Sequence, residues 1–203
     1  MKLQHLEAVK KIEDSNRHFS IKLYDHVAHS NNNNVVVSPF SIQSVLSMVL
    51  SGAAGETANQ IRFGLSLPED KFLHSGLSDI LTSMGDKSEN YTLKAVNRLY
   101  IQNGFHLRPR FLAFNQRTYQ AVPEIVDFQE VEKARQAINT WVREETNQKM
   151  EELISPGVLT PLSRLVLINA LYFKGTWVEP FDKADTRKKN FHTNNGQVVR
   201  VDM

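Results

Sequence analysis

The strongest constraint on the fold is a nearly uninterrupted apolar run at residues 165–173, LVLINALYF. In a soluble protein such a run is typical of a strand with both faces covered, because half-exposed strands alternate apolar and polar side chains. We therefore predict that this segment is a central strand of the largest sheet. Its one polar residue, Asn169, would be a buried amide that needs hydrogen-bond partners.

The remaining pattern combines helices and strands. Apolar residues at helical spacing predict helices at 6–28 (interrupted near 14–16), 39 to about 52, 72–84, 109–119 and 131–148. Shorter β-rich runs predict strands at 35–37, 91–101, 122–128 (an edge strand, because of Pro123) and a hairpin at 191–201 around Asn195-Gly196. This order of elements indicates a single α+β domain.

The predicted helix at 39 has a clear start signal. Ser38 is suited to cap the first turn, and Pro39 has the fixed φ that the first helical position favours. We expect the preceding β-branched run at 35–37 to be a buried strand that leads directly into this helix.

Charge and composition exclude several classes of protein. The chain has 24 basic and 22 acidic residues among 203, so its net charge of +2 favours neither nucleic acid nor an anionic membrane surface. The absence of cysteine excludes disulfides, a thiol nucleophile and cysteine-bound zinc, but leaves the redox compartment undecided. The first residues contain no apolar signal-peptide core, so we expect a signal peptide to be absent or already removed.

Motifs for catalysis and for cofactor binding are also absent from the sequence. It contains no nucleophile elbow, Walker loop, HExxH helix or EF-hand loop, and we expect no enzyme activity, cofactor or metal. His26 and His29 lie one helical turn apart and could bind a metal, although such pairs usually have surface or capping roles. Arg108, Arg110 and Arg117 could bind an anion or form a solvated helix face.

Four segments in chain order resemble the N-terminal part of the serpins. They are NVVVSPFSI at 34–42, GAAGETANQI at 52–61, LKAVNRLYIQNGFHLRPRF at 93–111 and INTWVREETNQKMEELISPGVLTPLSRLVLINALYFKGTW at 138–177. The resemblance extends from the first helix to Met203, and in detail it is to invertebrate serpins. It implies an α+β serpin fold in which N-terminal helices pack on a large mixed sheet.

The resemblance also implies that residues 1–203 are the N-terminal part of one serpin domain, without a separate second domain. We expect the fold to be incomplete without a C-terminal segment, which would be a necessary partner. Expressed alone, residues 1–203 are expected to aggregate or to lose cooperative unfolding, because unpaired strands leave buried backbone groups without hydrogen bonds.

The same resemblance assigns site residues. Ser38, Ser41 and Asn169 match the polar cluster that serpins call the shutter, beneath the strands that part when a new strand enters the sheet. Trp177 matches the aromatic residue of the breach, where loop insertion begins. The simpler alternative is that Ser38 only caps a helix, that Asn169 is a satisfied buried amide and that Trp177 only packs.

For function, the resemblance implies a serine protease inhibitor that acts, in its complete form, as a suicide substrate through insertion of a reactive loop. This chain would supply the receiving sheet and the shutter but not the loop, so only the complete protein would bind a protease. The alternatives are a non-inhibitory serpin (carrier, chaperone or storage protein) and a short binding module. A heparin-type polyanion is not expected, because the helix near 69–85 carries three acidic residues and one lysine.

Location is the least determined property. We expect a secreted protein, with an intracellular serpin as the alternative. Asn90-Tyr91-Thr92 is a glycosylation sequon in a polar connection, so a secreted form could carry a glycan on Asn90.

Overall fold

The computed structural model describes residues 2–29, 34–84 and 90–203. Its helices are α1 (Lys2–His29), α2 (Pro39–Leu50), α3 (Gly55–Gly64), α4 (Asp70–Met84), α5 (Pro109–Tyr119), α6 (Val131–Glu145) and the short 3-10 helix η1 (Lys183–Asp185). Its strands are β1 (Tyr91–Gln102), β2 (Val122–Val126), β3 (Leu165–Gly175), β4 (Lys188–His192) and β5 (Val198–Asp202). The predicted α+β class is confirmed.

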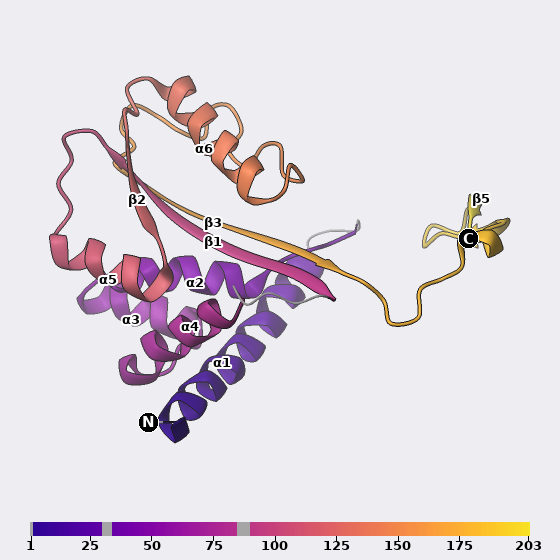
Figure 1. Ribbon diagram of the computed structural model, residues 1–203, viewed down its shortest axis with the longest axis horizontal. Coiled ribbons are helices and arrows are strands. Elements are labelled where there is room, and N and C mark those ends of the chain that lie inside the picture. Colours follow the sequence, from indigo (N-terminus) through magenta and orange to yellow (C-terminus); the bar gives the residue numbers. More distant parts are fainter. Residues whose placement is uncertain (1, 30–33, 85–89) are drawn as a thin grey trace.

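A three-stranded mixed sheet divides the molecule into two layers. β1 lies in the middle, parallel to β2 and antiparallel to β3, in the order β2-β1-β3. Helices α1 to α5 lie on one face of the sheet and α6 lies on the other (Figure 1). We call these the inner and the outer face.

Alternate residues of the paired strands enter two separate cores. On β1, Leu99 belongs to the inner cluster and Tyr100 to the outer cluster. On β3, Leu167 belongs to the inner cluster and Ile168 to the outer cluster. The outer cluster is completed by α6, which contributes Ile138, Trp141 and Val142. Both faces of this part of the sheet are therefore covered, which explains why its strands lack a polar side.

Helices α1 and α4 cross at Gly76, where there is no room for a larger side chain. A Cβ atom at this position would lie 2.6 Å from the carbonyl oxygen of Ala8 and 2.7 Å from the side chain of Ile12. The glycine therefore allows the two helix backbones to approach closely, and it brings Leu73 and Leu77 of the same helix into the inner core.

Two predictions about elements are wrong, and a third is not reproduced within the described residues. Among these residues β3 lies at the edge of its sheet, because it pairs only with β1, and its central position stays a prediction. Residues 35–37 form no strand and Val36 is 96% exposed, since no described strand lies beside them. Helix α1 runs without the interruption expected near residue 14.

The predicted hairpin is present and stands apart from the rest. β4 and β5 pair in antiparallel register around a turn in which Gly196 has a φ of +78°. An extended segment joins the hairpin to β3, and the hairpin lies away from the two-layer body (Figure 1). Every residue of both strands is exposed, so neither face of the hairpin is covered by the described residues.

Candidate functional site

The start of α2 is fixed by two serines. Ser38 caps the helix, and its Oγ accepts a hydrogen bond of 3.4 Å from the backbone N–H of Ser41. The same Ser38 hydroxyl donates to the Ser41 Oγ over 2.9 Å. Both residues are half-buried, so the pair lies at the boundary between solvent and the inner core.

A second polar pair crosses the sheet. Asn97 of β1 and Asn169 of β3 are opposite each other in the antiparallel register. The Asn169 Nδ2 donates to the Asn97 Oδ1 over 2.9 Å, and the Asn97 Nδ2 donates to the main-chain carbonyl of Tyr119 over 2.8 Å. A chain of hydrogen bonds thus runs from β3 through β1 to the last residue of α5.

One acceptor in this chain of hydrogen bonds has no partner among the described residues. The Oδ1 of Asn169 is buried and accepts no hydrogen bond from the described residues. A buried amide oxygen without a donor costs about 1–3 kcal/mol. It is therefore a position at which an incoming donor would gain a hydrogen bond.

Tyr119 extends the polar region toward α4. Its hydroxyl oxygen lies 3.1 Å from the Nδ1 of His74, within hydrogen-bonding distance. Burial raises the pKa of Tyr119 far above its ordinary range, and the nearby Asp70 carboxylate raises it further. Burial also lowers the pKa of His74. The Asp70 carboxylate partly raises this pKa again, whereas the Arg62 guanidinium lowers it further. Near neutral pH both rings are therefore uncharged.

The structure places the three predicted shutter residues in two pairs. Ser38 bonds to Ser41, whereas Asn169 bonds to Asn97, and within the described residues no hydrogen bond joins the two pairs. Helix α2 does pack against β3. Their joint role as a shutter stays a prediction.

Sequence reasoning did not assign Asn97 to this site, although this residue interrupts the largely apolar segment at 91–101. An asparagine in the middle of each of two buried strands was the available signal. It could not be used, because the register that sets the two amides opposite each other depends on the pairing of segments 72 residues apart.

Amides and hydroxyls give this region a specific chemical property. Each group can exchange one hydrogen-bond partner for another, whereas interlocked apolar side chains only lose contacts when strands separate. The region contains two amides on neighbouring strands, with one acceptor unused. This arrangement is suited to a sheet that changes its pairing.

Comparisons with known proteins identify the family. A family profile described as "Serpin (serine protease inhibitor)" matches residues 14–203. The chain belongs to the serpin family.

Individual serpins match nearly the whole chain. It is 36% identical to Serpin I2 of Homo sapiens over 93% of its own length and 47% of the relative. It is 37% identical to the leukocyte elastase inhibitor of Sus scrofa over 96% of its own length and 52% of the relative. The crystal structure of Serpin48, a highly specific serpin in the insect Tenebrio molitor, superposes with a TM-score of 0.84 at 34% identity, covering 95% of this chain and 53% of that one. The chain therefore spans about half the length of the serpins it matches.

The other predicted site residues of this serpin chain lie near the C-terminal end of β3. Trp177 follows the strand by two positions and is 78% exposed. Asn90 is exposed just before β1, and its backbone carbonyl accepts a hydrogen bond of 3.1 Å from the N–H of Thr176. The structure tests neither the breach role of Trp177 nor a glycan on Asn90.

Within the described residues the chain shows no candidate metal site of three or more ligands and no membrane-spanning helix. Among residues 2–29, 34–84 and 90–203, no group of three or more histidines, cysteines or acidic residues is arranged to hold a metal ion. The Nδ1 of His29 lies 2.7 Å from the backbone carbonyl oxygen of Asp25. In the same part of the chain, no helix is both long and apolar enough to cross a lipid bilayer.

Proposed function

We propose that this chain supplies the receiving sheet of a serine protease inhibitor that acts as a suicide substrate. In the complete protein a protease would cleave an exposed loop, and that loop would enter the sheet beside β3 as a new strand while the protease is trapped. The chain itself performs no catalysis in this scheme. Its role is to accept a strand.

The observation that carries the proposal is the free edge of β3. This strand has 11 residues and pairs on one side only within the described residues. A long unpaired edge presents a row of backbone donors and acceptors, which is a template for a further strand. Its exposure increases toward the end, where Phe173 is 64% exposed. We infer that a further polypeptide segment covers this edge.

The amide pair supports the same proposal. Asn169 lies in the middle of β3 and its buried Oδ1 has no donor within the described residues. A strand or side chain arriving at this position would supply one. We propose that Asn169, together with Ser38 and Ser41, forms the shutter and that Trp177 marks the breach, the end at which insertion begins.

The location of the complete protein is part of the proposal. We propose that it is secreted and glycosylated at Asn90, which is exposed as a glycan would require. A shift in mass after enzymatic deglycosylation, lost in the variant Asn90→Gln, is expected for protein purified from the medium of a secretory host.

Inhibition is tested by supplying the other half of a serpin. The 203-residue chain is co-expressed with the C-terminal half of the pig leukocyte elastase inhibitor, starting at the residue that follows the position aligned with Met203. Association is first measured by co-purification. The complex is then mixed with elastase, and the expected result is a band containing both proteins that survives boiling in detergent.

Three controls make the outcome decisive. The two halves of the pig inhibitor, expressed as separate chains, show that the two-chain format works. Elastase with its active-site serine blocked, and the 203-residue chain without a second half, must each give no such band. If the pig halves associate and this chain does not join the pig C-terminal half, the receiving-sheet proposal is wrong. If a stable complex is cleaved without trapping elastase, the non-inhibitory alternative is favoured.

A further inference from the structure

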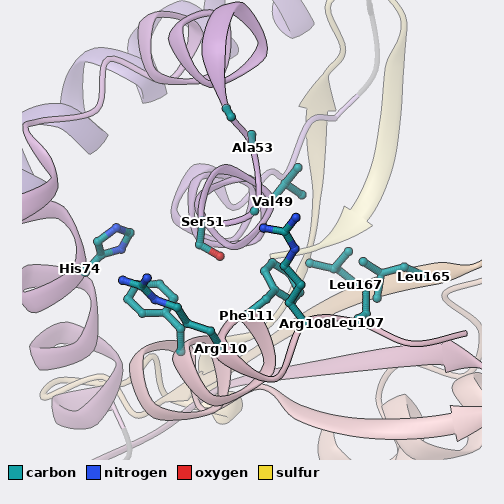
Figure 2. A pocket seen from close by; sticks show the side chains of 13 residues that line it. Val49, Ser51, Ala53, His74, Leu107, Arg108, Arg110, Phe111, Leu165 and Leu167 are labelled. Atoms are coloured by element: carbon teal, nitrogen blue, oxygen red, sulfur yellow. The ribbon is translucent and has the colours of Figure 1, made fainter.

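A pocket of about 910 Å³ opens on the inner side of the sheet. It lies between the end of α2, the helix α4, the start of α5 and the start of β3 (Figure 2). Val49, Phe111, Leu165 and Leu167 contribute apolar walls. Its volume lies within the range of about 300–1,000 Å³ that is usual for small-molecule sites, and such sites combine apolar walls with a few polar groups.

The polar groups of the pocket stand at its rim, with Arg108 and Arg110 on either side of Ser51. Figure 2 shows the hydroxyl of Ser51 between the side chains of Arg108 and Arg110. Within the described residues neither guanidinium forms an ion pair or a side-chain hydrogen bond, and no acidic residue lines the pocket. Two unpaired cations therefore stand at the edge of an apolar cavity.

The surroundings of the two arginines also favour a bound anion. Arg108 is the N-cap residue of α5 and its side chain makes no capping bond, so the positive end of the helix dipole adds a partial positive charge at the pocket. His74 also lines the pocket, but burial lowers its pKa, and it is uncharged near neutral pH. The Asp70 carboxylate raises the pKa of His74, but it is itself paired with Arg62. The positive charge of the site thus comes from the arginines and the helix end.

The shape and the charge together define a class of ligand. We infer that the pocket binds a fatty acid, with the carboxylate on one of the two arginines, Arg108 or Arg110, and the alkyl chain between Phe111, Val49 and Leu165. Guanidinium groups match a carboxylate with paired N–H donors, and the chain removes apolar walls from water. This inference is independent of protease inhibition.

The test uses 11-(dansylamino)undecanoic acid, a fluorescent fatty acid, with the 203-residue chain in its two-chain complex with the C-terminal half of the pig inhibitor. We expect saturable binding with a blue shift of the dansyl emission, and displacement by oleate. Methyl oleate has the same alkyl chain without the charge, and we expect it to displace the probe at least about tenfold less effectively, because a charge-assisted hydrogen bond contributes roughly 1.5–3 kcal/mol.

Variants connect the binding to the pocket. The double variant Arg108→Ala/Arg110→Ala is expected to weaken binding by at least about tenfold, for the same reason as the methyl ester. Arg117→Ala is the matched control, because this arginine is exposed on the same helix and does not line the pocket. Ala53→Trp, in the turn after α2, fills the opening and is expected to abolish binding. Circular dichroism confirms that each variant retains its helices.

Three results would overturn the inference. Equal competition by oleate and methyl oleate, or unchanged affinity in the double arginine variant, would show an apolar surface of the kind that another polypeptide covers. Unchanged affinity in a folded Ala53→Trp variant would place the probe elsewhere on the chain.

Discussion

The side-chain amide of Asn169 donates a hydrogen bond of 2.9 Å to the side-chain oxygen of Asn97, across the pair of strands β3 and β1. Asn97 in turn donates to the main-chain carbonyl of Tyr119 over 2.8 Å and is only 5% exposed. Asn97 is therefore the middle member of the chain, with one partner on each side. Asn169 is at the end, with one amide oxygen unused.

This asymmetry predicts different costs for the two asparagines. Asn97→Ala leaves both the Asn169 amide and the Tyr119 carbonyl without a partner, so we expect the opening free energy of the sheet to fall by about 2–4 kcal/mol. Asn169→Ala removes one bond but also the unused oxygen, and we expect a loss of about 1 kcal/mol. Hydrogen exchange of peptides from β1 and β3, followed by mass spectrometry, measures both. Gln116→Ala, which removes an exposed amide from α5, is the control. Equal losses in the two strand variants would contradict the geometry.

The close crossing at Gly76 predicts that Gly76→Ala is destabilising. Helix propensity alone would make this change favourable by about 1 kcal/mol. However, the added Cβ would lie 2.6 Å from the Ala8 carbonyl oxygen, and overpacking of this kind costs about 1–3 kcal/mol. The net cost is about 0–2 kcal/mol, so we expect α1 to detach more often and trypsin to cleave it up to about 30-fold faster, if cleavage follows the population in which α1 is detached. Gly64→Ala, at a glycine with no atom within 4 Å of the added Cβ, is the matched control and should not accelerate cleavage.

A charged residue adds to the apolar contacts that hold the outer layer to the sheet. The guanidinium carbon of Arg98 lies 4.5 Å from the ring centroid of Trp141 on α6, and Nη1 is 3.7 Å from a Glu124 carboxylate oxygen. We expect Arg98→Met to loosen α6, because the cation–π contact contributes about 0.5–2 kcal/mol. Glu124→Gln should have a smaller effect, because its carboxylate is exposed to solvent.

Tryptophan fluorescence measures this loosening. The chain has two tryptophans, so the background variant Trp177→Phe leaves Trp141 as the reporter. Emission of Arg98→Met is expected at longer wavelength than that of Glu124→Gln, since solvent reaches the indole ring. Identical spectra for the two variants would show that Arg98 does not position α6.

Burial of His74 predicts a dependence of stability on pH. Burial is the main reason that its folded-state pKa lies below the ordinary value of 6.5, so the unfolded chain takes up the proton at higher pH than the folded chain does. The contribution of His74 to stability is therefore fully present above pH 6.5 and is lost as the pH falls through the lowered pKa.

The urea concentration that removes half of the helical circular dichroism should thus be lower at about pH 5.5 than at about pH 7.5. His74→Gln is expected to reduce this difference, whereas His106→Gln, at an exposed loop position, should leave it unchanged. An imidazole pKa of His74 at or above 6.5 in an NMR titration would contradict the argument.

Local features of the sequence were sufficient to predict most elements. Ser38-Pro39 begins α2, the apolar stripe of residues 72–84 forms α4, and Pro123 lies on an edge strand, because capping, periodicity and the missing proline N–H act within a few residues. The serpin family followed from four ordered segments and is confirmed. By contrast, residues 35–37 have strong β propensity and form no strand, since a strand needs a neighbour that local sequence does not specify.

The sequence by itself indicated most of the helices and strands, which residues are apolar enough for a core, and the family to which the chain belongs. Only the tertiary structure decided that β3 pairs with β1 alone among the described residues, that Asn97 faces Asn169, and that Arg108 and Arg110 stand beside an apolar pocket. The physical reason is that strand register and pocket walls arise from contacts between distant segments. Each segment's own pattern is compatible with several partners, and the packing of the whole chain selects one of them.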